Sequence, residues 1–380
     1  MCYVLPALDG ERAAERAIGA GLLKGLLLAL LLYAFFVGLD LMGLSFKLFG
    51  RGFAEELITR TGNPFVGLFV GILTTTLVQS SSTTTSMTVG LVAAGALTVE
   101  GAVPIIMGAN IGTSVTNTLV ALGHVTRPEE FRRAFAGATV HDFFNWMSVL
   151  VLFPLELGTG FLSRAALGLE GLLEGAGGMK LADPLRAVVR PASEWIANAL
   201  GRSGSLTLVV GLGLLFLALR FLVRLLRVVF TARAEQVLHK TLFRSATAAV
   251  AAGVAMTVMV QSSSITTSVM VPLVGAGMVT LEQAFPFTIG ANLGTTVTAM
   301  LAALATGNAS AVAVAFSHLL FNLCGGVMIY PIPAVRRIPL ALARGLGTVA
   351  SRNRALAVVY IVGAFYGLPI LLLLLSGGFG

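Results

Sequence analysis

Charged residues are scarce in this chain of 380 residues: they make up 11% of it, whereas 56% is hydrophobic. Soluble domains carry roughly 25% charged residues, so this composition excludes an ordinary soluble protein. Three stretches, 22–44, 206–229 and 355–375, approach the roughly 20 apolar residues needed to cross a bilayer. The sequence therefore predicts an integral membrane protein.

Cysteine and the common hydrolase motifs are nearly or wholly missing. Cys2 and Cys324 are the only two cysteines, which excludes a disulfide framework. The chain contains neither an HExxH zinc motif nor a GxSxG nucleophile motif, and this argues against a membrane enzyme. The first 20 residues do not have the form of a cleavable signal peptide, so we expect the first apolar stretch to remain as a transmembrane anchor.

The net charge of +8 is concentrated in a few short segments rather than spread along the chain. One group of basic residues lies in and after an apolar stretch, and another lies between two apolar stretches. The first group is Arg220, Arg224, Arg227, Arg233, Lys240 and Arg244; the second is Arg336, Arg337, Arg344, Arg352 and Arg354. This concentration follows the positive-inside rule, so we interpret both groups as cytoplasmic topology signals that contact lipid headgroups, and we expect no nucleic-acid partner.

An internal repeat is the most informative feature of the sequence. The segment from Gln79 to Ala121 returns at Gln261 to Ala303, with 25 of 43 aligned positions identical and no gap. Each copy continues into a predicted helix with histidine and asparagine four residues apart, as in His141 and Asn145 of the first copy. Such similarity at a fixed offset predicts two copies of one structural unit.

Loop charge predicts that the two copies have opposite orientations. Arg12, Arg16 and Lys24 place the N-terminus inside, and one crossing then leaves the first copy to begin outside. Polar runs interrupt the apolar segments 64–97 and 245–279, which suits re-entrant hairpins better than single spans. The first copy begins and ends outside and the second begins and ends inside. This is an inverted-topology repeat, an architecture in which secondary transporters place substrate near the bilayer midplane.

The predicted fold is therefore an all-α integral membrane protein with inverted repeats, two re-entrant helical hairpins and broken transmembrane helices. Its segments are 1–63 with the first transmembrane helix, 64–157 as repeat one, 158–204 as an external linker with surface helices, 205–242 as a transmembrane helix and basic cytoplasmic loop, 243–335 as repeat two, and 336–380 as a cytoplasmic loop and last transmembrane helix.

Each predicted hairpin carries a glutamine followed by serines and threonines. Inside a membrane, polar groups that lack partners are energetically costly. Hydroxyls donate to anion oxygens, and a hairpin tip exposes N–H groups at the positive end of a helix. An isolated Ser-Thr pair would be explained by bonding to the preceding helical turn, but two long runs at equivalent positions favour a binding site. The candidate anion-binding residues are Gln79, Ser80, Ser81, Ser82, Asn110, Thr113, Gln261, Ser262, Ser263, Ser264 and Asn292.

Two further motifs, GANIGTSVT at 108–116 and GANLGTTVT at 290–298, place an asparagine between glycines. Glycine beside a polar residue at membrane depth predicts an unwound helix whose carbonyls bind a cation. The alternative is close helix packing through small residues, and the two roles are compatible.

Asp142 is the only acid inside a well-defined apolar span, which makes it a candidate functional residue. We expect His141 and His318 to form hydrogen bonds within the helix bundle. Neither polar run contains an arginine, so an anion bound there would depend on bound cations to balance its charge.

The paired QSSS motifs and the stretch from Val103 to Glu156 resemble the type II sodium-dependent phosphate cotransporter family, over about residues 20–376. The resemblance implies phosphate held between the two QSSS regions, sodium as the coupling ion with no other cofactor, alternating access, and a place in the inner (plasma) membrane. It also implies that Asp142 marks an electrogenic member, and that Asn145, Thr295 and Thr298 belong to another sodium site. The candidate sodium ligands are then Thr84, Ser86, Asn110, Thr113, Thr116, Asp142, Asn145, Thr266, Asn292, Thr295 and Thr298.

The chain departs from that family at Arg127 and Pro128, where animal relatives carry an acid and then a base, and it lacks their large outer loop. Phosphate export, transport of another small oxyanion such as sulfate or arsenate, and a channel are the alternatives that the sequence leaves open. A homodimer is one of the assemblies that it also leaves open.

Overall fold

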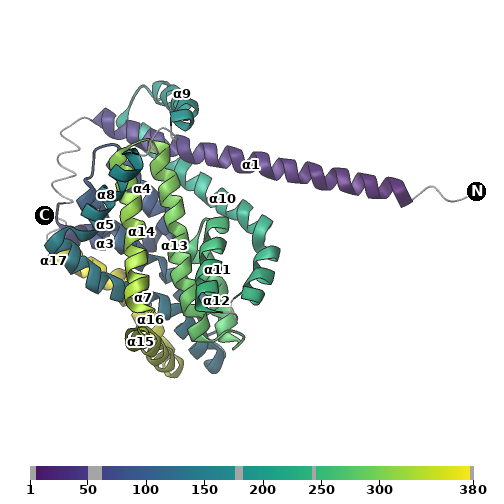
Figure 1. Ribbon diagram of the computed structural model, residues 1–380, viewed down its shortest axis with the longest axis vertical. Helices are drawn as coiled ribbons and strands as arrows, with labels where there is room; N and C mark the ends of the chain where they lie inside the picture. The colour runs from purple at the N-terminus through teal and green to yellow at the C-terminus, as the bar shows by residue number, and fades with distance from the viewer. Residues whose placement is uncertain (1–5, 50–61, 176–182, 242–244, 377–380) are drawn as a thin grey trace, which may run out of the picture.

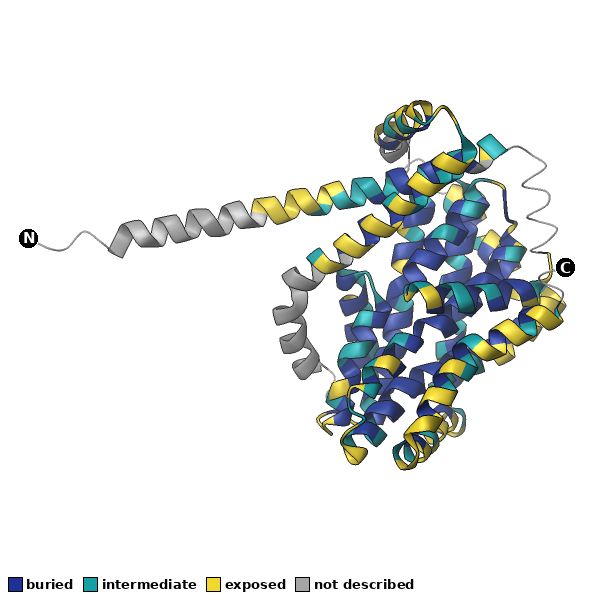
Figure 2. Cartoon of the chain, turned by 180° about the vertical axis from the view of Figure 1, so that it is seen from behind, coloured by how far each residue is buried: buried dark blue, intermediate teal, exposed yellow. Residues whose placement is uncertain are grey.

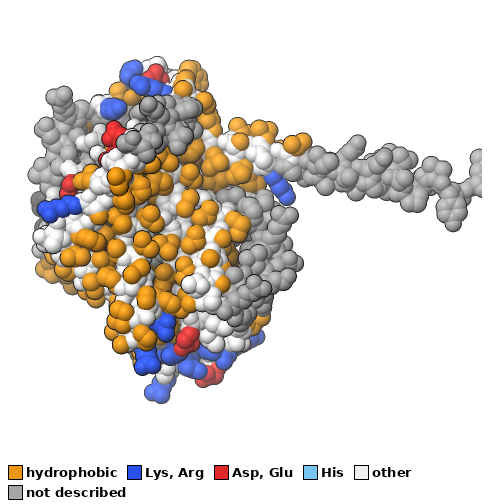
Figure 3. Space-filling model, viewed as in Figure 1, with side chains coloured by type: hydrophobic (Ala, Val, Ile, Leu, Met, Phe, Trp, Pro, Cys, Tyr) orange, Lys and Arg blue, Asp and Glu red, His pale blue; other side chains and the backbone are white. Residues whose placement is uncertain are grey.

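The computed structural model describes residues 6–49, 62–175, 183–241 and 245–376, and within these ranges every regular element is a helix (Figure 1). Seven of the described helices are long and apolar enough to cross a membrane. Apolar side chains cover the middle of the face seen in Figure 3, and Lys and Arg side chains gather toward its two ends. The prediction of an all-α integral membrane protein is confirmed.

Two helical hairpins contain the QSSS motifs. The first consists of α3 (Pro64–Val78) and α4 (Ser81–Ala93), and the second of α11 (Ala246–Val260) and α12 (Ser263–Gly275). Each hairpin turns at its glutamine, which has a left-handed backbone with φ of 57° at Gln79 and 55° at Gln261. Their N–H groups cap the preceding helices by donating to the carbonyls of Thr75 (2.7 Å) and Thr257 (2.6 Å). Left-handed non-glycine residues are uncommon, so their recurrence shows that both tips have the same constrained turn.

The helices after the hairpins differ between the repeats. In the first repeat, α5 (Val99–Thr113) and α6 (Val115–Leu122) are separated at Ser114, whereas in the second α13 (Leu281–Thr306) is continuous. The predicted unwinding of the second GAN motif is therefore wrong.

Close packing accounts for the glycines of both motifs. A Cβ at Gly290 would overlap the backbone carbonyl of Val250 in α11, and one at Gly108 would overlap that of Leu68 in α3. The absence of a side chain at these two positions lets α13 and α5 approach the first helices of their hairpins at backbone distance. The alternative explanation of the glycines, helix packing through small residues, is the one that the structure supports.

The hairpins enter the bundle from opposite ends of α13. Since an α-helix rises 1.5 Å per residue, this helix of 26 residues is roughly 39 Å long. The open end of the second hairpin, at Gly275, precedes the start of α13 by six residues. The open end of the first hairpin lies at the other end of α13, where the side chain of Asn308 donates to the carbonyl of Ala93 (3.3 Å). An inverted repeat requires this arrangement.

The remaining helices surround the repeats, and Figure 2 shows the inner helices buried and the outer ones exposed in part. They are α1 (Pro6–Phe49), α7 (Pro128–Thr159), α8 (Phe161–Gly175), α9 (Asp183–Ala199), α10 (Gly204–Thr241), α14 (Ala309–Ile329), α15 (Pro333–Arg352), α16 (Arg354–Val362), a π-helical turn (Gly363–Gly367) and α17 (Leu368–Leu375). Helices α7 and α14 carry the paired histidines, and α10 connects the two repeats.

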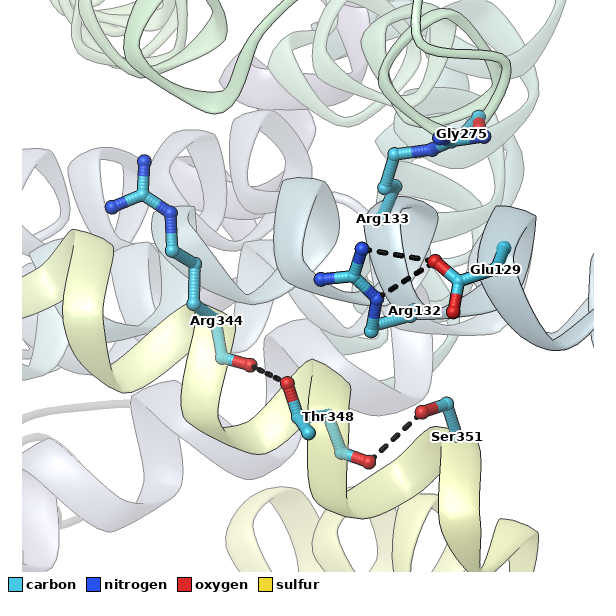
Figure 4. A network of polar contacts seen from close by, with 7 residues as sticks. All are labelled: Glu129, Arg132, Arg133, Gly275, Arg344, Thr348 and Ser351. Atoms are coloured by element: carbon cyan, nitrogen blue, oxygen red, sulfur yellow. Dashed lines mark hydrogen bonds and ion pairs between the residues drawn. The ribbon is translucent and has the colours of Figure 1, made fainter.

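A basic cluster lies at the end of the bundle where α13 begins (Figure 4). There Arg132 of α7 pairs with Glu129 (2.9 Å), and Arg133 donates to the carbonyl of Gly275 (2.9 Å). Arg344 of α15 forms an ion pair with Glu282 in the first turn of α13. Basic residues of α7 and α15 thus meet at one end of the bundle, as the predicted membrane topology requires.

Candidate functional site

The tips of the two hairpins meet in the middle of the bundle. The hydroxyl of Ser82 donates to the carbonyl of Gln261 (3.4 Å), and the hydroxyl of Ser264 donates to the carbonyl of Thr113 (3.5 Å). Beside this contact lies a cavity of about 640 Å³. Its polar lining from the two repeats is Gln79, Ser80, Ser82, Thr83, Thr116, Gln261, Ser262 and Ser264. Two motifs that lie 182 residues apart in sequence (261 − 79) therefore form one polar cavity.

Both second helices of the hairpins begin at this cavity. Ser80 accepts a hydrogen bond from the N–H of Thr83 (3.2 Å), and Ser262 accepts one from the N–H of Ile265 (3.4 Å). The other N–H groups of a first helical turn lack helical partners, and the helix dipole places partial positive charge there. Two helix N-termini that converge on one hydroxyl-lined cavity favour an anion.

Five predicted anion ligands do not line the cavity. Ser81 and Ser263 are buried in the first turns of their helices, and Asn110, Thr113 and Asn292 are buried in α5 and α13. The structure thus brings six of the eleven predicted anion ligands to the cavity wall and leaves these five behind it.

The two repeats differ in how their tips are fastened. The hydroxyl of Thr298 donates to the side-chain oxygen of Gln261 (2.7 Å), which ties the second hairpin to α13. The equivalent residues of the first repeat are Thr116 and Gln79, and no such bond joins them in the described part of the chain; the Thr116 hydroxyl is buried without a partner there. The first tip therefore lacks the bond that ties the second tip to the helix after it, whereas a bond from Thr75 to Thr84 (2.9 Å) joins the two helices of the first hairpin.

A continuous line of hydrogen bonds connects the repeats behind the cavity. From donor to acceptor it runs through Thr267, Asn117, His141, Asn292, Asn145 and the carbonyl of Asn110, with distances of 3.0, 3.3, 2.7, 2.8 and 2.7 Å. We call this line the Asn-His relay. Because the amide of Asn292 donates to Asn145, its oxygen must accept from His141, whose proton is therefore on Nε2.

The relay confirms that His141 forms hydrogen bonds within the bundle. The same expectation fails for His318, whose Nδ1 is buried without a partner among the described residues. The histidines of the two repeats are thus equivalent in sequence but not in their surroundings.

Several predicted sodium ligands present unpaired oxygen atoms. Asp142 is fully buried; its Oδ2 accepts from the hydroxyl of Tyr360 (3.0 Å), but its Oδ1 has no partner in the described part of the chain. The hydroxyls of Ser86 and Thr116 are also buried and unpaired there. Buried polar atoms without partners are costly, and a cation would satisfy such oxygens.

Thr298 donates to the side-chain oxygen of Gln261, and the four remaining predicted sodium hydroxyls donate to carbonyls of the preceding turn; a hydroxyl that donates in this way retains lone pairs. These bonds run from Thr84 to Ser80 (3.3 Å), Thr113 to Ala109 (2.8 Å), Thr266 to Ser262 (3.0 Å) and Thr295 to Asn292 (2.6 Å).

Sequence reasoning missed three residues at the site. Tyr360 lies in the last apolar stretch, where only its polar hydroxyl distinguished it. Arg220 and Arg224 of α10 line the cavity beside the hairpin tips. The polar runs themselves contain no arginine, but α10 brings these two side chains to the cavity from outside both repeats, which the sequence analysis did not predict.

The opposed hairpins and the cavity between their tips define a multi-span helical membrane protein with two oppositely oriented repeats, an architecture found in many secondary transporters. Residues 34–171 and 214–329 match the family described as Na+/Pi-cotransporter. This chain belongs to that family.

Curated relatives are similar along almost the whole chain. The sodium-dependent phosphate transport protein 2A of Ovis aries is 36% identical over 96% of this chain and 70% of its own length. The sodium-dependent phosphate transport proteins 2B of Pongo abelii and Homo sapiens are each 34% identical over 92% of this chain and 65% of their own length. This chain thus spans about two thirds of these relatives. No solved structure matches it.

Proposed function

We propose that this protein is a symporter that carries inorganic phosphate across the plasma membrane together with sodium. The observation that carries the proposal is the meeting of the two QSSS tips, with Ser82 of one hairpin bonded to Gln261 of the other at the cavity. Family membership and the names of the relatives, sodium-dependent phosphate transport proteins, support the choice of phosphate and sodium.

The cavity lining suits a small tetrahedral oxyanion. Serine hydroxyls at Ser80, Ser82, Ser262 and Ser264 offer donors from two sides, and both N-termini of α4 and α12 add partial positive charge. In this proposal Gln79 closes the site through its side-chain amide, whereas the amide of Gln261 is held by Val258 and Thr298.

Sodium binds, in this proposal, to buried oxygens that have no partner in the described part of the chain. Asp142 supplies a full negative charge, and Ser86 and Thr116 supply neutral oxygens. A carboxylate inside a membrane span is stabilised when it pairs with a cation, so Asp142 gives transport a net movement of charge. Binding of sodium before phosphate would balance the charge of the anion.

In this proposal the protein works by alternating access, which the opposed orientation of the two repeats supports. The hairpins enter from opposite ends of the bundle, and only the second is tied to its own repeat by the bond between Thr298 and Gln261. If the first tip gained such a bond while the second tip lost its own, the tips would be exposed first to one side of the membrane and then to the other.

The proposal is tested by uptake of radiolabelled phosphate into proteoliposomes that contain the purified protein. An inward sodium gradient should drive accumulation above equilibrium, whereas an equal potassium gradient should not. Sulfate and arsenate are added as competitors in parallel samples. Uptake that ignores the sodium gradient would refute symport, and stronger competition by sulfate than by unlabelled phosphate would refute phosphate as the substrate.

The Asp142→Asn variant should lose the voltage dependence of uptake. The substitution keeps the size and the hydrogen bond from Tyr360 but removes the buried charge. Uptake is measured while a potassium gradient with valinomycin sets the membrane potential. The Tyr360→Phe variant is the control: it removes only the hydroxyl and should keep the voltage dependence. Voltage dependence that persists in Asp142→Asn would contradict the role of this carboxylate.

A further inference from the structure

Two arginines of α10 face the cavity between the hairpin tips. Arg220 and Arg224 lie four residues apart, so they project from one face of the helix about 6 Å apart along its axis. Both line the cavity together with Ser80 and Ser82 of the first tip and Ser262 of the second. Phe216, one turn earlier on the same face, completes this part of the wall.

Neither guanidinium is engaged within the part of the chain that the structure describes. Arg127, Arg132, Arg190 and Arg344 each pair with a carboxylate, but no ion pair or hydrogen bond joins Arg220 or Arg224 to a described residue. The residues that line the cavity include no aspartate or glutamate. Two positive charges therefore lie beside hydroxyl donors and the N-termini of two helices. All three kinds of group attract an anion.

We propose that Arg220 and Arg224 are anion-recognition residues at the mouth of the cavity, which attract inorganic phosphate and contact it as it passes to or from the hairpin tips. The inference rests on the proposed function and adds two residues from outside both repeats. Guanidinium groups match the geometry of phosphate oxygens through paired N–H donors, more closely than a lysine does.

The position of both arginines on the cavity defines how they act. Salt that enters the cavity screens their charges, so their attraction for an anion falls steeply as ionic strength rises. Charges at the rim of a low-dielectric cavity raise the local concentration of an oppositely charged substrate. The hydroxyls deeper in the cavity form neutral hydrogen bonds that salt affects little. The arginines therefore determine the salt dependence of phosphate binding.

A phospholipid headgroup offers the same phosphate chemistry, and α10 belongs to a candidate membrane span. The hydroxyl-lined cavity favours the free anion, because lipid contact does not require the serines of two hairpin tips on the opposite wall. The experiments distinguish the two sources directly.

The first experiment measures binding of radiolabelled inorganic phosphate to the full-length purified protein in sodium, at low and high ionic strength. The double variant Arg220→Gln, Arg224→Gln should bind phosphate roughly tenfold or more weakly at low ionic strength, as expected for the loss of charged hydrogen bonds, and its affinity should depend little on salt. The Arg337→Gln control removes an exposed arginine outside the cavity and should bind like the native protein. Native affinity and native salt dependence in the double variant would overturn the proposal.

The second experiment needs no variant, so it does not depend on the folding of one. The native protein is treated with phenylglyoxal, which modifies arginine, and the modified peptides are quantified by mass spectrometry. Inorganic phosphate should protect Arg220 and Arg224 but not Arg337. Equal modification with and without phosphate, or protection by phosphatidylglycerol alone, would overturn the proposal. Failure of the proposed function is a separate result: the native protein would then bind no phosphate in sodium.

Discussion

The Gly290→Ala variant should unfold at a markedly lower temperature than the native protein. A Cβ at this position would overlap the carbonyl of Val250, so α13 and α11 would have to separate. Overpacking of a well-packed interior destabilises by about 1–3 kcal/mol, and contact with backbone is less easily relieved than contact with a side chain. Thermal unfolding of the purified variants in one detergent, followed by intrinsic fluorescence, measures the effect.

The repeat provides a second variant and the chain provides a control. Gly108→Ala should lower the unfolding temperature in the same way, since its Cβ would overlap the carbonyl of Leu68. Gly345→Ala, on an exposed part of α15 with open space around it, should leave the protein as stable or raise stability by about 0.5–1 kcal/mol through helix propensity. Equal unfolding temperatures for Gly290→Ala and Gly345→Ala would contradict the close approach of α11 and α13.

Removal of the His141 side chain should have the second large effect, because it interrupts the Asn-His relay at its centre. In His141→Ala the amide of Asn117 loses its acceptor and the oxygen of Asn292 loses its donor. Each buried group left without a partner destabilises by about 1–3 kcal/mol. We expect a lower unfolding temperature and loss of most sodium-driven phosphate uptake, since the relay joins helices of both repeats.

The His318→Ala variant is the matched control. It removes an equally buried histidine from the corresponding helix of the second repeat, yet no side-chain hydrogen bond of His318 exists among the described residues. Both variants leave a cavity of similar size, so the difference between them reports the relay. If the two variants lose stability and transport equally, the relay contributes nothing beyond packing.

The stability and transport assays also separate two roles of the glycine and asparagine motifs. The glycines act through packing, so Gly108 and Gly290 should affect folding first. Asn292 of α13 donates a hydrogen bond to Asn145 of α7. This pair therefore contributes both to stability and to the way in which the two repeats are held together.

Much of the architecture was determined by the sequence alone. Scarce charge and long apolar stretches required a membrane protein. The segment that begins at Gln79 recurs at Gln261, and this required two copies of one unit. Loop charge then oriented the copies oppositely. These features are local or periodic, so they can be read without knowing which helices touch. The hydroxyl runs at the hairpin tips were predictable for the same reason.

Tertiary structure alone decided which of those residues face one another. Packing placed Ser82 against Gln261, left Asn292 in the Asn-His relay behind the cavity, and brought Tyr360 onto Asp142 from the far end of the chain. It also kept α13 continuous, where the glycine pattern alone was compatible with unwinding, because the glycines serve backbone contact. Periodicity defines the faces of a helix, but the partner of each face depends on long-range contacts. Sequence therefore determined the repeat, and the packing of α10 onto the tips decided that arginine lines the cavity.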